Sequence, residues 1–184
     1  MLPRGIDYSV YNSTSGMSTK HWGPACWSFL FTSILGHYPV SMDKRDPAHV
    51  EIATYYYHLF KSFTVILPCV YCRDSFKEFI EDMPIDEFLV GRMELMYWVY
   101  LIKDKVNNKL ITQERRSFDK LRKELYERFK FGRITHQEYD AQLNVCKKES
   151  FNTLPTPSFQ EVLDKYESLR AVCSTEAKTC SLKN

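Results

Sequence analysis

Apolar residues recur at helical spacing through most of this 184-residue chain, and prolines stand at the edges of those stretches. This period buries one stripe of a helix, whereas a half-buried strand needs alternation at every second residue. The chain contains only 6 glycines, which argues against a fold rich in strands and tight turns. It is long enough for one domain with a hydrophobic core. The sequence therefore predicts an all-α fold.

Successive apolar segments follow one another with short connections between them. Short connections between helices are typical of a helical bundle, so we expect a four-helix bundle. Prolines and capping residues mark where each helix begins and ends. The expected starts are Ser18 or Thr19, Pro47, Pro68 and Asp86, and the expected ends of the first three helices are Gly36, Leu67 and Pro84.

The sequence becomes highly charged from Glu114 onward. Gly132 divides this part and Thr135 can cap a second helix, which predicts a charged helical hairpin. A proline-rich linker follows, and Ser158 with Glu161 matches the pattern of a capping box. The expected parts are a flexible arm at 1–18, a helical bundle at 19–112, an inserted hairpin at 113–153, a fifth helix completing the bundle at 154–172 and a cysteine-containing tail at 173–184.

The formal net charge is +2, with basic and acidic residues interleaved, so nothing electrostatic favours nucleic acid or an acidic membrane as a partner. The first residues lack the apolar core of a signal peptide. The longest nearly uncharged stretch, 21–40, is interrupted by Pro24, Gly36 and Pro39, which makes it a poor membrane span. These features predict a soluble, cytoplasmic protein with no membrane partner.

The strongest local signal is the motif Pro68-Cys69-Val70-Tyr71-Cys72. Two cysteines three residues apart on a helix lie on one face, close enough to form a disulfide. The first lies at the helix start, where unpaired N–H groups and the helix dipole favour a thiolate, and Arg73 adds positive charge. We therefore predict that Cys69 and Cys72 are a catalytic, redox-active pair.

A Cys-x-x-Cys pair can also be half of a zinc site, or two inert buried thiols. Zinc would need a second pair of ligands, and the other cysteines and the histidines lack suitable spacing. We therefore expect no metal, although a zinc-binding adaptor stays open as an alternative. A thioredoxin-like motif requires a βαβ setting, whereas the flanks of this pair are predicted to be helical.

Three blocks of residues resemble the Erv/ALR-type FAD-linked sulfhydryl oxidases, above all the viral members. They agree in order and spacing with the family patterns WGxxxW…YP, PCxxC and W…HNxVNxxL, over about half of the chain. The segment Pro157 to Tyr166 is similar to the short fifth helix of the family. The three blocks are Trp22-Gly23-Pro24-Ala25-Cys26-Trp27 with Tyr38-Pro39, Leu67-Pro68-Cys69-Val70-Tyr71-Cys72, and Trp98 with Val106-Asn107-Asn108-Lys109-Leu110.

The resemblance implies that the bundle holds FAD at one end, between helices rather than in a Rossmann crevice. It implies that Cys69 exchanges electrons with thiols, that Cys72 is the thiolate next to the flavin, and that O2 is reduced to H2O2. From periodicity alone, Trp27 and Trp98 are expected in the core. The residues implied to contact FAD are Gly23, Pro24, Trp27, Phe31, Tyr38, Trp98, Lys103, Asp104, Val106, Asn107, Lys109 and Leu110.

The resemblance also implies a homodimer. The implied partners are thiol-containing protein substrates or a thioredoxin-like carrier, together with O2. The viral likeness suggests a viral assembly site in the host cytoplasm, or the virion. The hairpin at 113–153 is either a solvated element or a surface for dimerisation or docking.

Four residues depart from the family pattern. Phe31 stands where the family has His, Lys103-Asp104 stands where it has His-Asn, and Tyr100 replaces a disulfide cysteine. Besides the zinc-binding adaptor, two functions therefore stay open. One is a sulfhydryl oxidase, and the other is a structural or interaction protein, such as a viral shell component, that keeps the helical fold without turnover.

The remaining cysteines are scattered. Cys173 and Cys180 lie in a tail without periodicity, and many relatives carry a mobile shuttle disulfide at one terminus. The resemblance therefore implies a shuttle pair, and two unpaired tail thiols are the alternative. Cys26 is expected as a packed helix residue, and Cys146 is assigned no role.

Overall fold

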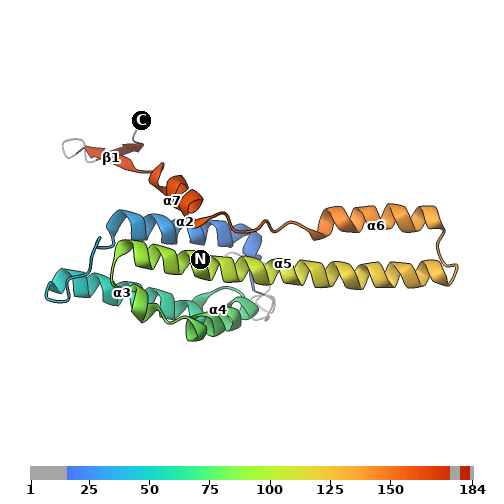
Figure 1. The fold of residues 1–184 in the computed structure, drawn as a ribbon, viewed down its shortest axis with the longest axis horizontal. Coiled ribbons are helices and arrows are strands. Elements are labelled where there is room, and N and C mark those ends of the chain that lie inside the picture. Colours follow the sequence, from blue (N-terminus) through green and yellow to red (C-terminus); the bar gives the residue numbers. More distant parts are fainter. Residues whose placement is uncertain (1–15, 175–178, 183–184) are drawn as a thin grey trace, which may run out of the picture. The chain divides into compact units, whose positions relative to one another are not determined.

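A computed structural model describes residues 16–174 and 179–182 (Figure 1). The chain divides into two compact units. The first comprises the chain up to Leu101 and again from Ser158, and the second is Ile102–Pro157. Most of the expected N-terminal arm therefore lies outside the described residues.

Helices make up nearly all of the regular structure in the described ranges. In chain order they are α2 (Thr19–His37), α3 (Pro47–Ile66), α4 (Val70–Asp82), the 3-10 helix η1 (Ile85–Phe88), α5 (Arg92–Lys130), α6 (His136–Ser150) and α7 (Phe159–Glu167). Two strands, β1 (Ala171–Ser174) and β2 (Thr179–Leu182), pair as an antiparallel hairpin. The predicted helical fold class is confirmed, with this hairpin as an addition. None of the described helices combines the length and apolarity needed to cross a bilayer.

Side chains at the helix starts explain several of the boundaries. The Asp46 carboxylate accepts a hydrogen bond from the Ala48 N–H at 2.9 Å, and Pro47 occupies the first position of α3. Capping boxes start α6, with Thr135, and α7, with Ser158. The predictions that Pro47 opens the second helix and that Ser158 caps the last one are confirmed.

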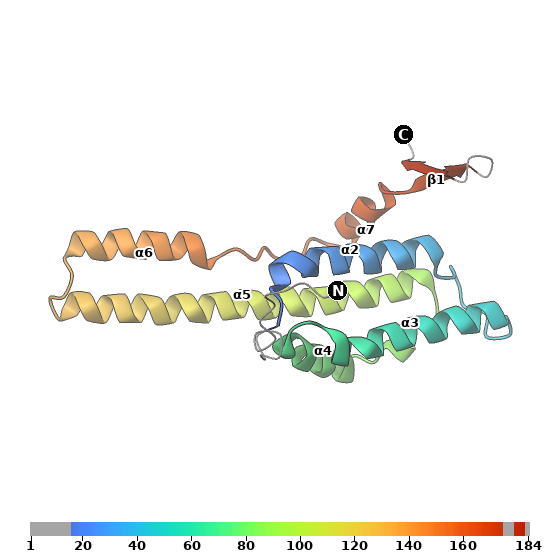
Figure 2. The same cartoon turned by 180° about the vertical axis from the view of Figure 1, so that it is seen from behind.

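The first unit is built around helices that lie side by side in both views: α2, α3 and the first turns of α5 (Figures 1 and 2). In addition, α4 packs against α3, and α7 packs against α2. Aromatic rings meet edge to face in this core, with 4.8 Å between the ring centroids of Phe60 and Trp98 and 5.7 Å between those of Phe63 and Phe76. The largest fully buried side chains belong to Trp98, Tyr38, Phe31, Phe60, Leu30, Ile34, Leu95, Met96, Ile102 and Val99.

The fourth predicted helix and the first arm of the charged hairpin form one continuous helix, α5. The expected boundary between them lies at 112 and 113. No glycine or proline lies between Arg92 and Lys130, so nothing interrupts the backbone hydrogen bonds where the side chains become charged. Asp86, expected as the cap of this helix, lies in η1 instead.

The entry to α5 is fixed by a close backbone approach. Gly91 pairs with Ser41 in an isolated antiparallel bridge. A Cβ added to Gly91 would lie 2.9 Å from the carbonyl oxygen of Val40, so a larger residue would push the two segments apart. This contact sets where α5 begins.

The second unit is a helical hairpin formed by α5 from Ile102 onward and α6. Gly132 turns the chain with φ +67°, as expected for the residue that ends the first arm. The rings of Phe118 and Phe151 meet at 5.2 Å between centroids. The Glu114 carboxylate accepts hydrogen bonds from the backbone N–H groups of Asn152 and Thr153, both at 3.2 Å. The second arm is thereby tied back to the first.

The last helix is shorter than predicted, and the tail has a structure that was not predicted. We expected the helix to reach 172, but α7 ends at Glu167, whose carboxylate pairs with the guanidinium of Arg170. Tyr166 is buried whereas Leu169 is 47% exposed, so a further turn would have had no core to cover. The tail, expected to lack regular structure, contains β1 and β2.

Candidate redox site

Cys69 does not lie within α4 but caps it. The helix begins at Val70, and Cys69 has an extended backbone with φ −145° and ψ 124°. Its Sγ accepts a hydrogen bond from the backbone N–H of Cys72 at 3.3 Å. This corrects the expectation that Pro68 starts the helix with both cysteines inside it. The cap position still brings Cys69 next to the first turn, which carries Cys72, at the positive end of the helix dipole.

The surroundings of the pair combine a packed side and an open side. Both cysteines are half-buried. Behind them, α4 packs on α3, and Ser75 is buried with its hydroxyl donating to the carbonyl oxygen of Tyr71. The Tyr71 side chain, between the two cysteines in sequence, is 76% exposed. The motif is therefore open to solvent on the side of Tyr71.

The predicted flavin-contacting residues on α2 differ in exposure. Gly23 and Trp27 are half-buried, and Pro24 is exposed. Phe31 is fully buried and stacks on Tyr166 of α7, with ring centroids 4.9 Å apart and planes 23° apart. In the sequence, Tyr166 is noted only as the end of the segment that is similar to the family's fifth helix. Its pairing with Phe31 depends on tertiary packing, so no local sequence signal indicates it.

Tyr38 and Trp98 are fully buried, and their polar atoms are bonded to the backbone. The Tyr38 hydroxyl donates to the carbonyl oxygen of Leu89 at 2.8 Å, and the Trp98 indole N–H donates to that of Met83 at 2.9 Å. Burial, with a smaller effect of the neighbouring Tyr56, raises the pKa of Tyr38 to about 12. Tyr38 therefore stays protonated at neutral pH, as a hydrogen-bond donor.

The second unit carries the other predicted flavin-contacting residues. The amide of Asn107 donates to the hydroxyl of Thr156 at 2.9 Å, and the Asp104 carboxylate accepts from the amide of Asn108 at 2.9 Å. Leu110 is 36% exposed. The predicted residues of this unit that are half-buried are Lys103, Asp104, Val106, Asn107 and Lys109.

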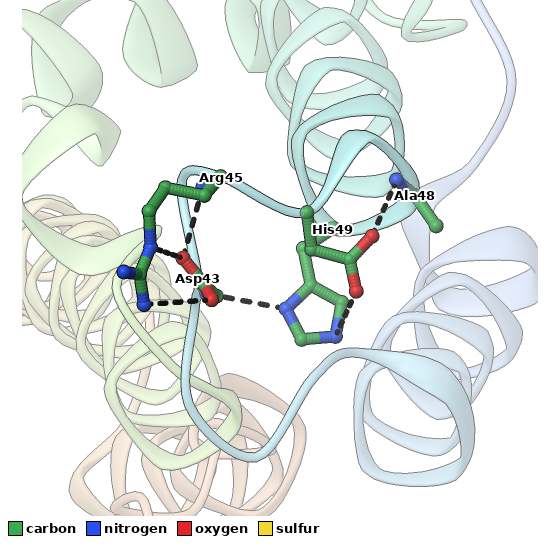
Figure 3. A network of polar contacts seen from close by, with 5 residues as sticks. Asp43, Arg45, Ala48 and His49 are labelled. Atoms are coloured by element: carbon green, nitrogen blue, oxygen red, sulfur yellow. Dashed lines mark hydrogen bonds and ion pairs between the residues drawn. The ribbon is translucent and has the colours of Figure 1, made fainter.

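A polar cluster that the sequence analysis did not single out stabilises the loop between α2 and α3 (Figure 3). The Asp43 carboxylate accepts hydrogen bonds from the backbone N–H of Arg45, at 2.9 Å, and from its guanidinium. These bonds hold the pKa of Asp43 below its ordinary value. His49 Nδ1 accepts from the Asp43 backbone N–H at 3.1 Å. The loop that follows Tyr38 is thus stabilised by side chains of its own.

The tail pair lies on the two strands of the hairpin. Cys173 is disulfide-bonded, and its Cα partner in the antiparallel register is Cys180. The side chain of Cys180 lies outside the described residues. Elsewhere, Cys26 and Cys146 are half-buried, and burial raises the pKa of the Cys26 thiol. Within the described ranges, no three His, Cys, Asp or Glu side chains gather as metal ligands would.

Comparison with known proteins decides the family. A model of the Erv1 / Alr family matches residues 24–130, which is more than half of the chain and includes α3, α4 and α5. The chain belongs to the Erv1 / Alr family. The resemblance noted in the sequence is thereby confirmed, and Cys69 and Cys72 lie inside the matched region.

A viral relative of this Erv1 / Alr family member is named as a probable FAD-linked sulfhydryl oxidase, from Acanthamoeba polyphaga mimivirus. The two sequences are 33% identical over 92 residues, which is 50% of this chain. The match spans 59% of the length of that relative.

Proposed function

We propose that this chain is an FAD-dependent sulfhydryl oxidase that forms disulfides in protein substrates. The observation that carries the proposal is the geometry of the family's Cys-x-x-Cys motif, in which Cys69 caps α4 and its sulfur accepts the N–H of Cys72. The name of the mimivirus relative supports the same reaction class. The overall reaction is 2 R–SH + O2 → R–S–S–R + H2O2.

The residues present fit FAD in their chemistry. A flavin site needs apolar and aromatic surface for the ring system and a few polar or cationic groups for the rest of the molecule. Trp27 supplies a half-buried indole, and Lys103 and Lys109 are half-buried cations. Phe31, Tyr38 and Trp98 are fully buried, and the polar atoms of Tyr38 and Trp98 already have partners, so these three side chains contact FAD only if the packing around them opens.

The two cysteines carry the electrons through thiol–disulfide exchange. A substrate thiolate attacks Sγ of Cys69 in the Cys69–Cys72 disulfide, forming a mixed disulfide and releasing Cys72 as a thiolate. A second substrate thiolate then displaces Cys69, so the substrate leaves oxidised and the pair holds two electrons and two protons. FAD, when bound, supplies a two-electron acceptor that O2 reoxidises to give H2O2. The N–H groups at the start of α4 support negative charge on the sulfur of Cys69.

We also propose that Cys173 and Cys180 form the shuttle disulfide that passes electrons from protein substrates to Cys69. Cys173 is disulfide-bonded, and the two Cα atoms are paired across the β1–β2 hairpin. The β1–β2 hairpin is a short element, with four residues in each strand, that carries this pair of cysteines. The partners of this reaction are thiol-containing proteins or a thioredoxin-like carrier.

The proposed setting follows the viral relative. We propose that the protein works as a homodimer at a viral assembly site in the host cytoplasm, or in the virion. Size-exclusion chromatography with light scattering tests the dimer, and localisation in infected cells tests the setting.

A second candidate is a structural or interaction protein without turnover. It is favoured by the engagement of several predicted flavin-contacting side chains within the protein itself. Phe31 stacks on Tyr166, and the amide of Asn107 donates to Thr156. These side chains have to exchange partners for FAD to use them.

One experiment separates the two functions. The visible absorption spectrum of the purified full-length protein is recorded before and after addition of dithiothreitol in air, while dissolved oxygen is followed. A flavin band that bleaches and returns as oxygen is consumed supports the oxidase. A colourless protein that stays colourless after incubation with FAD contradicts it and favours the structural role.

A further inference from the structure

The chain just before α2 crosses the start of the redox motif. The backbone N–H of Met17 donates to the carbonyl oxygen of Pro68, with 2.7 Å between nitrogen and oxygen. The indole N–H of Trp22 in turn donates to the carbonyl oxygen of Met17 at 3.1 Å. Trp22, in the first turn of α2, therefore fixes Met17 by a hydrogen bond. Met17 in turn fixes Pro68, the residue directly before Cys69.

Gly16 is the residue that permits this crossing. Its φ is +62°, a backbone conformation that residues with a Cβ rarely adopt. A Cβ at this position would lie 1.9 Å from the oxygen of Pro68 and 2.9 Å from the Cα of Cys69. Both are backbone atoms, so no side-chain rotation can relieve the overlap. The dihedral and the contact are independent reasons for glycine at position 16.

The crossing fixes the backbone that leads into Cys69. The guanidinium of Arg73 donates to the carbonyl oxygen of Leu67, so both carbonyl groups that precede Cys69 are bound. With this segment fixed, Cys69 keeps the extended backbone from which its Sγ caps α4. A shift of the Pro68–Cys69 peptide would move the sulfur away from the N–H of Cys72.

We propose that Gly16 and Met17 form a backbone clamp that holds Pro68–Cys69 in the capping conformation and thereby sets the redox equilibrium of the Cys69–Cys72 pair. Gly16 is thus a positioning residue that acts through Cys69. The clamp favours the reduced pair, because a capped sulfur accepts an N–H, and a stabilised dithiol makes a disulfide more oxidising. This inference rests on the proposed redox role of the pair, but not on FAD or oxygen.

The test compares Gly16→Ala with Gly36→Ala in the full-length chain. Gly36 is a matched control, because a Cβ added there meets nothing within 4 Å. Each protein is equilibrated in glutathione buffers, in which the Cys69–Cys72 disulfide and two glutathione thiols give the dithiol and one glutathione disulfide. The mixture is then quenched by alkylation and analysed by mass spectrometry.

We expect Gly16→Ala to need a ratio [GSH]²/[GSSG] about fivefold higher for half-reduction, the effect of losing one helix cap. We also expect Cys69 to be alkylated more slowly by a similar factor, relative to Cys146 in the same molecule. Gly36→Ala should match the unaltered chain in both measurements. Equal midpoints and equal alkylation rates in the two variants would overturn the clamp.

A second variant tests the clamp if Gly16→Ala does not fold. If that variant loses its cooperative thermal transition, Trp22→Phe replaces it, because it keeps the aromatic ring and removes the donor to the Met17 carbonyl. A shift in the same direction supports the clamp, and an unchanged midpoint overturns it. Absence of oxygen consumption by the unaltered chain would reject the proposed oxidase, while the glutathione midpoints would still decide about the clamp.

Discussion

At the scale of single residues, the buried aromatic side chains show how polar atoms are accommodated in this core. The indole N–H of Trp98 and the hydroxyl of Tyr38 both donate to backbone carbonyl groups. A buried donor or acceptor without a partner destabilises a fold, so these bonds allow the two rings to be packed inside. The same bonds use the indole N–H of Trp98 and the hydroxyl proton of Tyr38, so neither is available to donate to a ligand.

We expect Trp98→Phe to lower the free energy of unfolding by about 0.5–1.5 kcal/mol, because the carbonyl group of Met83, a half-buried residue, loses its donor. Urea denaturation followed by circular dichroism measures the change. Trp27→Phe, at a half-buried position, is the control for losing an indole. A stability equal to that of the unaltered chain, together with a lower flavin content, would instead identify Trp98 as a cofactor contact alone.

Cys72→Ser should reduce dithiothreitol-dependent oxygen consumption to the background rate, because the pair can then no longer form its disulfide. The absorption band of a bound flavin should also cease to bleach. Oxygen consumption under saturating dithiothreitol is the measurement, and Cys146→Ser is the matched control. Activity that survives in Cys72→Ser would show that the electrons take another path.

At the scale of helices, the capping boxes make part of the stability depend on pH. Hydrogen bonds from Ser158 hold the pKa of Glu161 below its ordinary value of 4.5. A carboxyl group with a lowered pKa in the fold stabilises the fold above its ordinary pKa and loses that effect as the pH falls through the folded pKa. The start of α7 should therefore weaken below pH 4.5.

Ser158→Ala should lower the melting temperature at neutral pH by roughly 2–4 °C, the effect of about 1 kcal/mol in a chain of this size. It should also remove the part of the acid dependence that Glu161 contributes. Thermal melts at neutral and acidic pH check both expectations. Ser117→Ala, at an exposed position within α5, is the control. An undiminished acid dependence in Ser158→Ala would mean that other carboxylates cause it.

Elements that are marked by their own side chains could be predicted from the sequence, whereas elements that depend on distant residues could not. Pro47 and the Ser158 capping box mark helix starts by their own side chains, so the sequence reveals them. The continuity of α5 was missed because a change from apolar to charged residues was interpreted as a new element. The β1–β2 hairpin was missed because such short strands depend on their pairing partner and show no clear periodicity.

The candidate site could be predicted only in part from the sequence, for a similar reason. The Cys-x-x-Cys spacing and the preceding proline indicate the candidate redox motif directly. The roles of Cys69 as a cap and of Gly16 beside Pro68 depend on φ angles and on a contact between distant segments. The stacking of Phe31 on Tyr166 likewise joins residues far apart in sequence. No local pattern contains that information.

At the scale of the whole molecule, the cysteines define the proposed path of the electrons along the first unit. We expect the double variant Cys173→Ser and Cys180→Ser to slow the oxidation of a reduced protein substrate more than that of dithiothreitol, because a small dithiol reaches Cys69 directly. Oxygen consumption with the two substrates measures the ratio. An equal effect on both would exclude the shuttle role, and Cys26→Ser is the control for losing a thiol outside the path.

The cap at Cys69 has a consequence for how this molecule can be observed. In the proposed mechanism, the same sulfur atom that completes the first turn of α4 also takes part in electron transfer, so each change of its bonding alters the environment of a backbone amide. The exchange of the Cys72 amide proton with deuterium should therefore differ between the oxidised and the reduced protein. The exchange rate of this backbone amide would then report the redox state of the cysteine pair, without a dye and without turnover.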